Sequence, residues 1–182
     1  MSAVHTVEVA GLTRQLPLFE VAPGVTIAIL NILGDVELVR ASAKALAAKL
    51  AAADYDVLLT AEAKSIPLIH TLAEEANKPY VVLRKSYKSY MGEAISAETV
   101  SITTNATQTL YLDAKDLPLV AGKRIVLVDD VVSTGSTQAG MRSIVEKAGG
   151  QVVAEAAIFT EGDASKWQNI LALGHLPVFT SS

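Results

Sequence analysis

The chain contains no cysteine and only three histidines, and aromatic residues make up 5% of it. The lack of cysteine excludes disulfides, thiolate nucleophiles and cysteine-based zinc sites, and it fits a reducing compartment. The histidines, His5, His70 and His175, do not have the spacing of metal ligands. We therefore expect neither a metal ion bound by histidine nor catalysis by a thiolate.

Long hydrophobic runs and a strong excess of one charge are also missing. The most apolar early run, residues 25–33, has about half the length needed to span a bilayer. Residues 1–8 lack the basic and apolar regions of a signal peptide. The net charge of −4 gives no electrostatic footprint for nucleic acid. We expect a cytoplasmic protein with neither a membrane nor a nucleic acid as partner.

The remaining composition is that of an ordinary globular protein. The chain has 182 residues, of which 51% are hydrophobic and 19% charged. This length fits one domain, residues 1–182, with enough material for a substantial core. No internal repeat, linker or low-complexity tract divides it.

Strand patterns alternate with helix patterns along the chain. Short apolar runs predict strands at residues 25–33, 56–60, 80–83, 125–128 and 152–159. Apolar residues at three- and four-residue spacing predict helices at about residues 36–53, 67–77, 138–148 and, more briefly, 165–173. This order predicts an α/β fold with a central, mostly parallel sheet flanked by helices. Ligands of such folds bind beyond the carboxyl ends of the strands.

Residues 124–137 carry the most specific pattern. The apolar run 125–128 predicts a buried strand, and the two carboxylates of Asp129 and Asp130 follow it directly. Small hydroxylic and glycine residues at 133–137 then precede a helix. Carboxylates can accept hydrogen bonds from vicinal hydroxyls, while amides and hydroxyls at a helix N-terminus can surround a phosphate. The pattern predicts a sugar-phosphate site.

Two further loops should open at the same edge of the sheet, because each follows a predicted strand. Residues 61–65 contain Lys64, and residues 84–88 contain further cations. Ordinary surface cations are the alternative interpretation, since lysine is mostly exposed. From residue 84 to 113 the pattern loosens, which predicts a long excursion with a flexible hairpin that acts as a lid.

Residues 126–137, Val-Leu-Val-Asp-Asp-Val-Val-Ser-Thr-Gly-Ser-Thr, resemble the signature of type I phosphoribosyltransferases. The agreement in order and spacing extends over roughly residues 12–180. Residues 82–85, with Lys88 after them, are similar to the Arg-Lys segment of adenine and xanthine phosphoribosyltransferases. The resemblance implies the type I fold, with an N-terminal hood-like segment at about residues 1–35 and a flexible loop or hairpin over the site at about residues 86–112.

The resemblance also implies a reaction and its residues. A purine base would displace pyrophosphate from C1 of phosphoribosyl pyrophosphate (PRPP) and give a nucleoside monophosphate. The catalytic residues would be Asp129 and Asp130, which hold the ribose hydroxyls. The 5-phosphate loop would consist of Ser133, Thr134, Gly135, Ser136 and Thr137. The pyrophosphate would be bound by Ala63, Lys64, Ser65, Arg84, Lys85 and Lys88. Mg²⁺ would be carried by the pyrophosphate near Asp129 with no direct protein ligand, and a homodimer is expected by analogy.

Departures from the family pattern leave more than one base as a candidate substrate. The Glu-Tyr-Gly segment of adenine enzymes is replaced by Ile102-Thr103-Thr104-Asn105, which has no acid, and their Phe-Arg pair by residues 25–28. Lys64 stands where many relatives have arginine, which keeps a cation but loses a bidentate donor. Adenine is favoured, with xanthine, guanine or hypoxanthine as alternatives and a pyrimidine as a weaker one. A non-catalytic module that senses PRPP or a nucleotide is the competing class of function.

Overall fold

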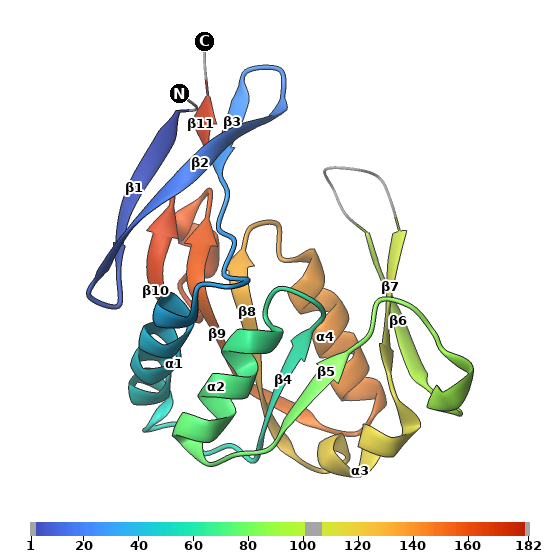
Figure 1. Ribbon diagram of the computed structural model, residues 1–182. Helices are drawn as coiled ribbons and strands as arrows, with labels where there is room; N and C mark the ends of the chain where they lie inside the picture. The colour runs from blue at the N-terminus through green and yellow to red at the C-terminus, as the bar shows by residue number, and fades with distance from the viewer. Residues whose placement is uncertain (1–2, 101–106, 181–182) are drawn as a thin grey trace.

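The computed structural model of the chain describes residues 3–100 and 107–180. Its centre is a five-stranded sheet in the order β10-β9-β8-β4-β5, with every neighbouring pair parallel. The strands are β4 (Val57–Ala61), β5 (Tyr80–Leu83), β8 (Arg124–Val132), β9 (Gln151–Glu161) and β10 (Ile170–Leu176). Figure 1 shows these strands with their carboxyl ends at one edge. The predicted fold class is confirmed.

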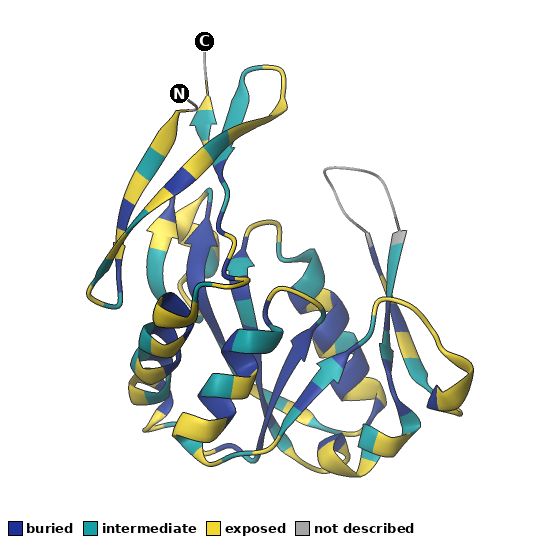
Figure 2. Ribbon diagram, viewed as in Figure 1, coloured by how far each residue is buried: buried dark blue, intermediate teal, exposed yellow. Residues whose placement is uncertain are grey.

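Helices cover both faces of this sheet, and β8 shows why its sequence is apolar throughout. Val126 and Val128 pack into the core formed with α1 (Val36–Leu50) and α2 (Ile66–Ala76). Ile125 and Leu127 alternate to the other face, where the core includes α4 (Ser136–Lys147) and the short α3 (Leu117–Val120). Because each face of a strand takes every second residue, a strand buried on both sides is a continuous apolar run. The central strands are accordingly buried in Figure 2.

The helix boundaries follow from local signals. The side chain of Asp35 accepts a hydrogen bond of 3.0 Å from the Leu38 amide and caps α1. Pro67 lies in the first turn of α2, and Asn77 ends that helix in the left-handed conformation. Both helices were predicted, although α1 ends at Leu50 rather than near residue 53.

A separate antiparallel sheet lies above the central one, in the order β1-β2-β3-β11. Its strands are β1 (Val4–Val9), β2 (Leu12–Ala22), β3 (Val25–Ala28) and β11 (Phe179–Thr180). The predicted strand at 25–33 is therefore too long, since β3 ends at Ala28. Arg14 on β2 makes a bidentate ion pair with Asp35 at 2.7 and 3.1 Å, which ties this sheet to α1.

The excursion after β5 contains a hairpin of β6 (Ile95–Val100) and β7 (Thr107–Leu112), preceded by a 3-10 turn at Ser89–Met91. The hairpin packs on α4 beside Gly140, where an added Cβ would collide with the side chain of Thr99. In Figure 1 the end of β6 and the start of β7 lie toward the side where the central strands end. The sequence segment without an acid, residues 102–105, lies outside the described residues.

The C-terminal part corrects another prediction. Residues 165–173 are not a helix, because a short 3-10 turn at Ala164–Trp167 is followed by β10 at the edge of the central sheet. Another 3-10 turn spans Ala114–Asp116. Within residues 3–100 and 107–180, no helix is long and apolar enough to cross a membrane.

Candidate functional site

A pocket of about 210 Å³ lies where β4 and β8 end, and it joins segments that are far apart in the sequence. The residues that line it are Ala61, Glu62, Ala63, Lys64, Ser65, Lys85, Asp129, Asp130, Val131 and Thr137. The adjacent acids, the 61–65 loop and a lysine after β5 thus meet, as the strand-end argument predicts. The peptide bond between Glu62 and Ala63 is cis.

Ser65 connects the two acids. Its hydroxyl lies 3.0 Å from Oδ1 of Asp129 and 3.1 Å from Oδ1 of Asp130. The backbone N–H of Asp130 in turn donates to Ser65 Oγ and to Asp129 Oδ1, each at 2.9 Å. Because a serine hydroxyl carries one proton, it can donate to only one of these carboxylates at a time or be shared between them.

The electrostatics of the acid pair are those of two close carboxylates in a pocket. The Asp129 side chain is half-buried among protein atoms, and its remaining surface lines the pocket. This burial, followed by the negative charge of Asp130, raises the pKa of Asp129 to about 7. Lys64 provides the compensating charge, with Nζ 3.1 Å from Oδ2 of Asp130. That contact lacks hydrogen-bond alignment, so the buried Oδ2 accepts no hydrogen bond. The Lys64 ammonium also donates to the carbonyl of Leu30 at 3.3 Å.

The loop from Ser133 to Thr137 connects β8 to α4. Gly135 is the N-cap of α4 with φ of 78°, a left-handed conformation that glycine adopts without strain. The hydroxyls of Thr134 and Ser136 lie 3.1 Å apart, and Thr137 lines the pocket beside the acids. The first turn of a helix presents unpaired backbone amides, so this loop has the donors that a phosphate requires.

The far side of the loop is supported by two residues that the sequence did not mark as functional. Glu161, buried at the end of β9, accepts a hydrogen bond of 2.6 Å from the Ser133 hydroxyl. Trp167 donates from Nε1 to the Glu161 carbonyl at 2.8 Å, and an added Cβ at Gly135 would lie 3.0 Å from its ring. A second pocket of about 280 Å³ opens here between the loop and Trp167. Glu161 could have been found by the same strand-end rule that marks the acids.

Residues 29–172 match the family model described as phosphoribosyl transferase domain. The chain belongs to this family. The match includes the acid pair, the 133–137 loop and the two cationic loops, so the predicted family membership is confirmed.

Similar proteins include both transcriptional regulators and enzymes. The purine biosynthesis transcriptional repressor PurR of Bacillus subtilis is 28% identical over 158 residues, which is 84% of this chain and 55% of that protein. Adenine phosphoribosyltransferase of Thermosipho africanus is 30% identical over 147 residues, which is 78% of this chain and 84% of that enzyme. The chain spans little more than half the length of the first relatives that it matches.

The fold is shared with a solved enzyme. The crystal structure of adenine phosphoribosyltransferase from Thermoanaerobacter pseudethanolicus superposes with a TM-score of 0.73 at 23% identity. The superposition covers 88% of this chain and 95% of that one. At this identity the likeness establishes the fold alone, and it agrees with the predicted type I architecture.

The predicted pyrophosphate-binding cations of this phosphoribosyltransferase domain divide into two groups. Lys64 and Lys85 line the pocket with the acids. Arg84 does not, since its Nε donates to Glu62 at 2.6 Å and its Nη1 to the Tyr90 hydroxyl at 3.4 Å. The Glu62 carboxylate raises the pKa of Arg84 and also accepts the backbone N–H of Lys85 at 2.6 Å. Lys88, exposed before the 3-10 turn, does not line the pocket either.

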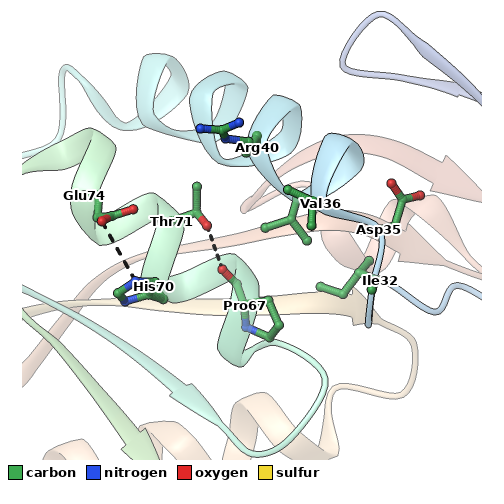
Figure 3. A pocket seen from close by; sticks show the side chains of 10 residues that line it. Ile32, Asp35, Val36, Arg40, Pro67, His70, Thr71 and Glu74 are labelled. Carbon is green, nitrogen blue, oxygen red and sulfur yellow. Dashed lines mark hydrogen bonds and ion pairs between the residues drawn. The ribbon is translucent and has the colours of Figure 1, made fainter.

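A hollow of about 380 Å³ lies elsewhere, between α1 and α2 (Figure 3). Its apolar lining includes Ile32, Val36 and Pro67. Its polar side chains are largely engaged with their own helix: Thr71 donates to the Pro67 carbonyl at 3.0 Å, and His70 lies 3.9 Å from Glu74. The hollow has neither the paired acids nor the phosphate loop, so the pocket at the strand ends is the candidate active site.

Proposed function

We propose that the chain is a purine phosphoribosyltransferase that transfers ribose 5-phosphate from PRPP to a purine base and releases pyrophosphate. The observation that carries this proposal is the shared lining of one pocket. Asp129 and Asp130, the cations Lys64 and Lys85, and Thr137 of the loop all face the same space. A ligand with two vicinal hydroxyls between two phosphorylated ends has the chemistry that these groups complement.

In this proposal the acids hold the ribose. Displacement at an anomeric carbon passes through an oxocarbenium-like species, in which positive charge builds up on the sugar. Asp129 and Asp130 would accept hydrogen bonds from the 2- and 3-hydroxyls and stabilise this charge. The loop Ser133–Thr137 would hold the 5-phosphate and thereby fix C1 relative to the incoming base. No protein nucleophile is required.

The departing pyrophosphate would be bound by the 61–65 loop. Lys64 and Lys85 supply positive charge, while Ala63 and Ser65 supply backbone and hydroxyl donors. Lys64 pairs with Asp130 in the ligand-free protein, so binding requires that its ammonium turn from that carboxylate to the phosphates. Arg84 and Lys88 would take part only after a change in side-chain conformation.

We further propose that Mg²⁺ accompanies PRPP. The residues of the pocket fit such an ion, because Oδ2 of Asp130 is a buried acceptor without a hydrogen bond and Mg²⁺ keeps several waters that can donate to carboxylates. The pyrophosphate oxygens would be its direct ligands, near Asp129, with no direct protein ligand. The ion would neutralise charge on the leaving group.

Adenine is the favoured base, because a relative that the chain covers over most of its length is an adenine phosphoribosyltransferase. Xanthine, guanine and hypoxanthine are the alternatives. Purified protein should be incubated with Mg²⁺, PRPP and each base in turn, with nucleotide and pyrophosphate measured separately. Nucleotide formation with one purine supports the proposal. If PRPP binds but no base reacts, the enzymatic proposal is wrong.

Non-catalytic sensing of PRPP or a nucleotide is a second candidate function. It is favoured by the similarity to the PurR repressor over 84% of this chain. A sensor should bind PRPP with a dissociation constant that responds to Asp130→Asn yet show no turnover with any base. An enzyme should lose turnover on the same substitution.

A homodimer in the cytoplasm completes the proposal. Leu33 and Val36 are large apolar residues exposed at the start of α1, next to the hollow between α1 and α2, and Val36 is 65% exposed. Light scattering should give twice the mass of the chain, and Val36→Asp should shift the protein toward monomer. The absence of cysteine fits the cytoplasm, and cell fractionation would test that location.

A further inference from the structure

Gln138 is a buried amide at a helix position that normally belongs to the core. It lies in the first turn of α4 and is 3% exposed. The buried face of α4 continues with Met141, Ile144 and Val145, at the spacing of an amphipathic helix. A polar side chain on such a face carries a desolvation cost unless it is hydrogen-bonded, so its partner is informative.

That partner is the acid pair. Nε2 of Gln138 donates to Oδ2 of Asp129 at 2.8 Å. The other oxygen of this carboxylate, Oδ1, lies within hydrogen-bond distance of Ser65 Oγ and the Asp130 amide. Donors from three elements therefore surround Asp129: the loop before α2, β8 itself and the first turn of α4.

The arrangement limits what Asp129 can still bind. An ionised carboxylate offers about four acceptor sites, and the three donors use three of them when the Ser65 hydroxyl donates to Asp129 rather than to Asp130. One site is left for a ligand. Asp130 differs, because its Oδ2 accepts no hydrogen bond and is paired with the ammonium of Lys64.

We propose that Gln138 is a positioning residue for PRPP binding: its amide fixes the orientation of the Asp129 carboxylate and favours the ionised form, so that one oxygen site faces the ribose. This inference rests on the proposed function. Gln138 itself does not line the pocket, so it acts through Asp129. The charged group that acts directly on Asp129 is Asp130 on the same strand, and Asp130 in turn is paired with Lys64 on the 61–65 loop.

The test compares two near-isosteric variants by calorimetric titration with PRPP and Mg²⁺ at pH 7 and pH 9, each relative to wild type. Gln138→Met removes the donor and should weaken PRPP binding by about tenfold at pH 7, as for loss of a hydrogen bond to a charged group. At pH 9 the part of this loss that comes from protonation of Asp129 should disappear, because the carboxyl is then ionised without help, and the loss should be smaller than at pH 7. Gln138→Glu places a second negative charge there, so its loss should grow with pH.

Opposite trends with pH are not expected of a residue that only packs α4. Gln151→Met makes the same chemical change at an exposed position at the other end of the sheet and should bind PRPP like wild type. A second measurement is the titration of the Asp129 carboxyl by NMR without ligand. Its midpoint should move to higher pH in Gln138→Met.

The outcomes distinguish a failure of the Gln138 role from a failure of the proposed function. If wild type binds PRPP and Gln138→Met binds it equally well with an unchanged Asp129 titration, the role of Gln138 is wrong and the proposed function stands. If both variants lose affinity equally at the two pH values, Gln138 is only structural. Wild-type protein that binds no PRPP overturns the proposed function and this role together.

Discussion

The Ser65 hydroxyl contacts Asp130 at two groups, its backbone N–H and its carboxylate. The Ser65 hydroxyl accepts the backbone N–H of Asp130 at 2.9 Å and lies 3.1 Å from its carboxylate oxygen Oδ1. Ser65 immediately precedes α2, whereas Asp130 belongs to β8. This contact fixes the proposed pyrophosphate loop relative to the proposed ribose acids, so the two halves of the pocket are not independent.

Removing that hydroxyl should therefore damage both stability and function. Ser65→Ala removes the one hydroxyl proton that the two carboxylates share and leaves the Asp130 amide with Asp129 as its only acceptor. We expect a loss of about 1–3 kcal/mol in the free energy of unfolding and a fall of about tenfold or more in kcat/KM for PRPP. Urea unfolding and steady-state kinetics measure both. Ser143→Ala on α4, outside the pocket, is the control, and equal behaviour of the two variants would contradict the assignment.

The raised pKa of Asp129 predicts how stability depends on pH. The folded protein binds this proton more tightly than the unfolded chain, whose carboxyl titrates near 3.8. The stabilisation it gives is complete below about pH 4 and is lost as the pH rises to about 7. Asp129→Asn removes the titration, so the variant should gain stability relative to wild type across this range, on the order of 1–3 kcal/mol by pH 8.

Chemical unfolding of both proteins at pH 4, 6 and 8 measures whether the stability of Asp129→Asn relative to wild type increases with pH. Asp129→Asn should at the same time cripple nucleotide formation, since the carboxylate is proposed to hold the ribose. A constant difference in unfolding free energy at all three pH values would show that Asp129 is ionised throughout.

Gly149, which follows α4, provides a matched control for substitution of Gly135 in the phosphate loop. Both have a positive φ, 78° and 77°, but an added Cβ would lie 3.0 Å from the Trp167 ring at Gly135 and meet nothing within 4 Å at Gly149. Gly149→Ala should cost about 1–2 kcal/mol for backbone strain alone. Gly135→Ala should cost about 1 kcal/mol more and should also weaken PRPP binding. Trp167→Leu added to Gly135→Ala should recover part of this extra cost.

The cations of the site can be ranked by substitution. Lys85 lines the pocket, whereas Arg84 is held by Glu62 and Tyr90. Lys85→Met should therefore raise the KM for PRPP by about tenfold, the effect of losing one charge-assisted contact, and Arg84→Met should raise it less. The reverse order would show that Arg84 leaves Glu62 when pyrophosphate binds.

The sequence was most informative where both faces of a segment are buried. The apolar run at 125–128 predicted the central strand because neither of its faces contacts water, and the acids after it predicted the edge at which the pocket opens. The Ser65 hydroxyl bridge could not be predicted, since it depends on a contact between residues 65 positions apart.

Edge elements escaped prediction for a physical reason. Residues 170–176 are apolar and partly exposed, a pattern that fits a helix or a strand equally well, and β10 is set by its pairing with β9. Gly174 allows this pairing, because an added Cβ there would lie 2.6 Å from Phe159. Gln138 was missed because helical spacing assigns its position to the core. The spacing does not reveal that the Asp129 carboxylate lies opposite it.

Trp167 is the only tryptophan of the chain, and its ring lies against Gly135 while its Nε1 donates to Glu161, the residue that holds Ser133. Its fluorescence therefore originates from a single place, the outer side of the proposed phosphate loop. A phosphorylated ligand that orders this loop changes the surroundings of one indole and of no other. The protein thus carries its own optical probe for titrating ligands, without any added label.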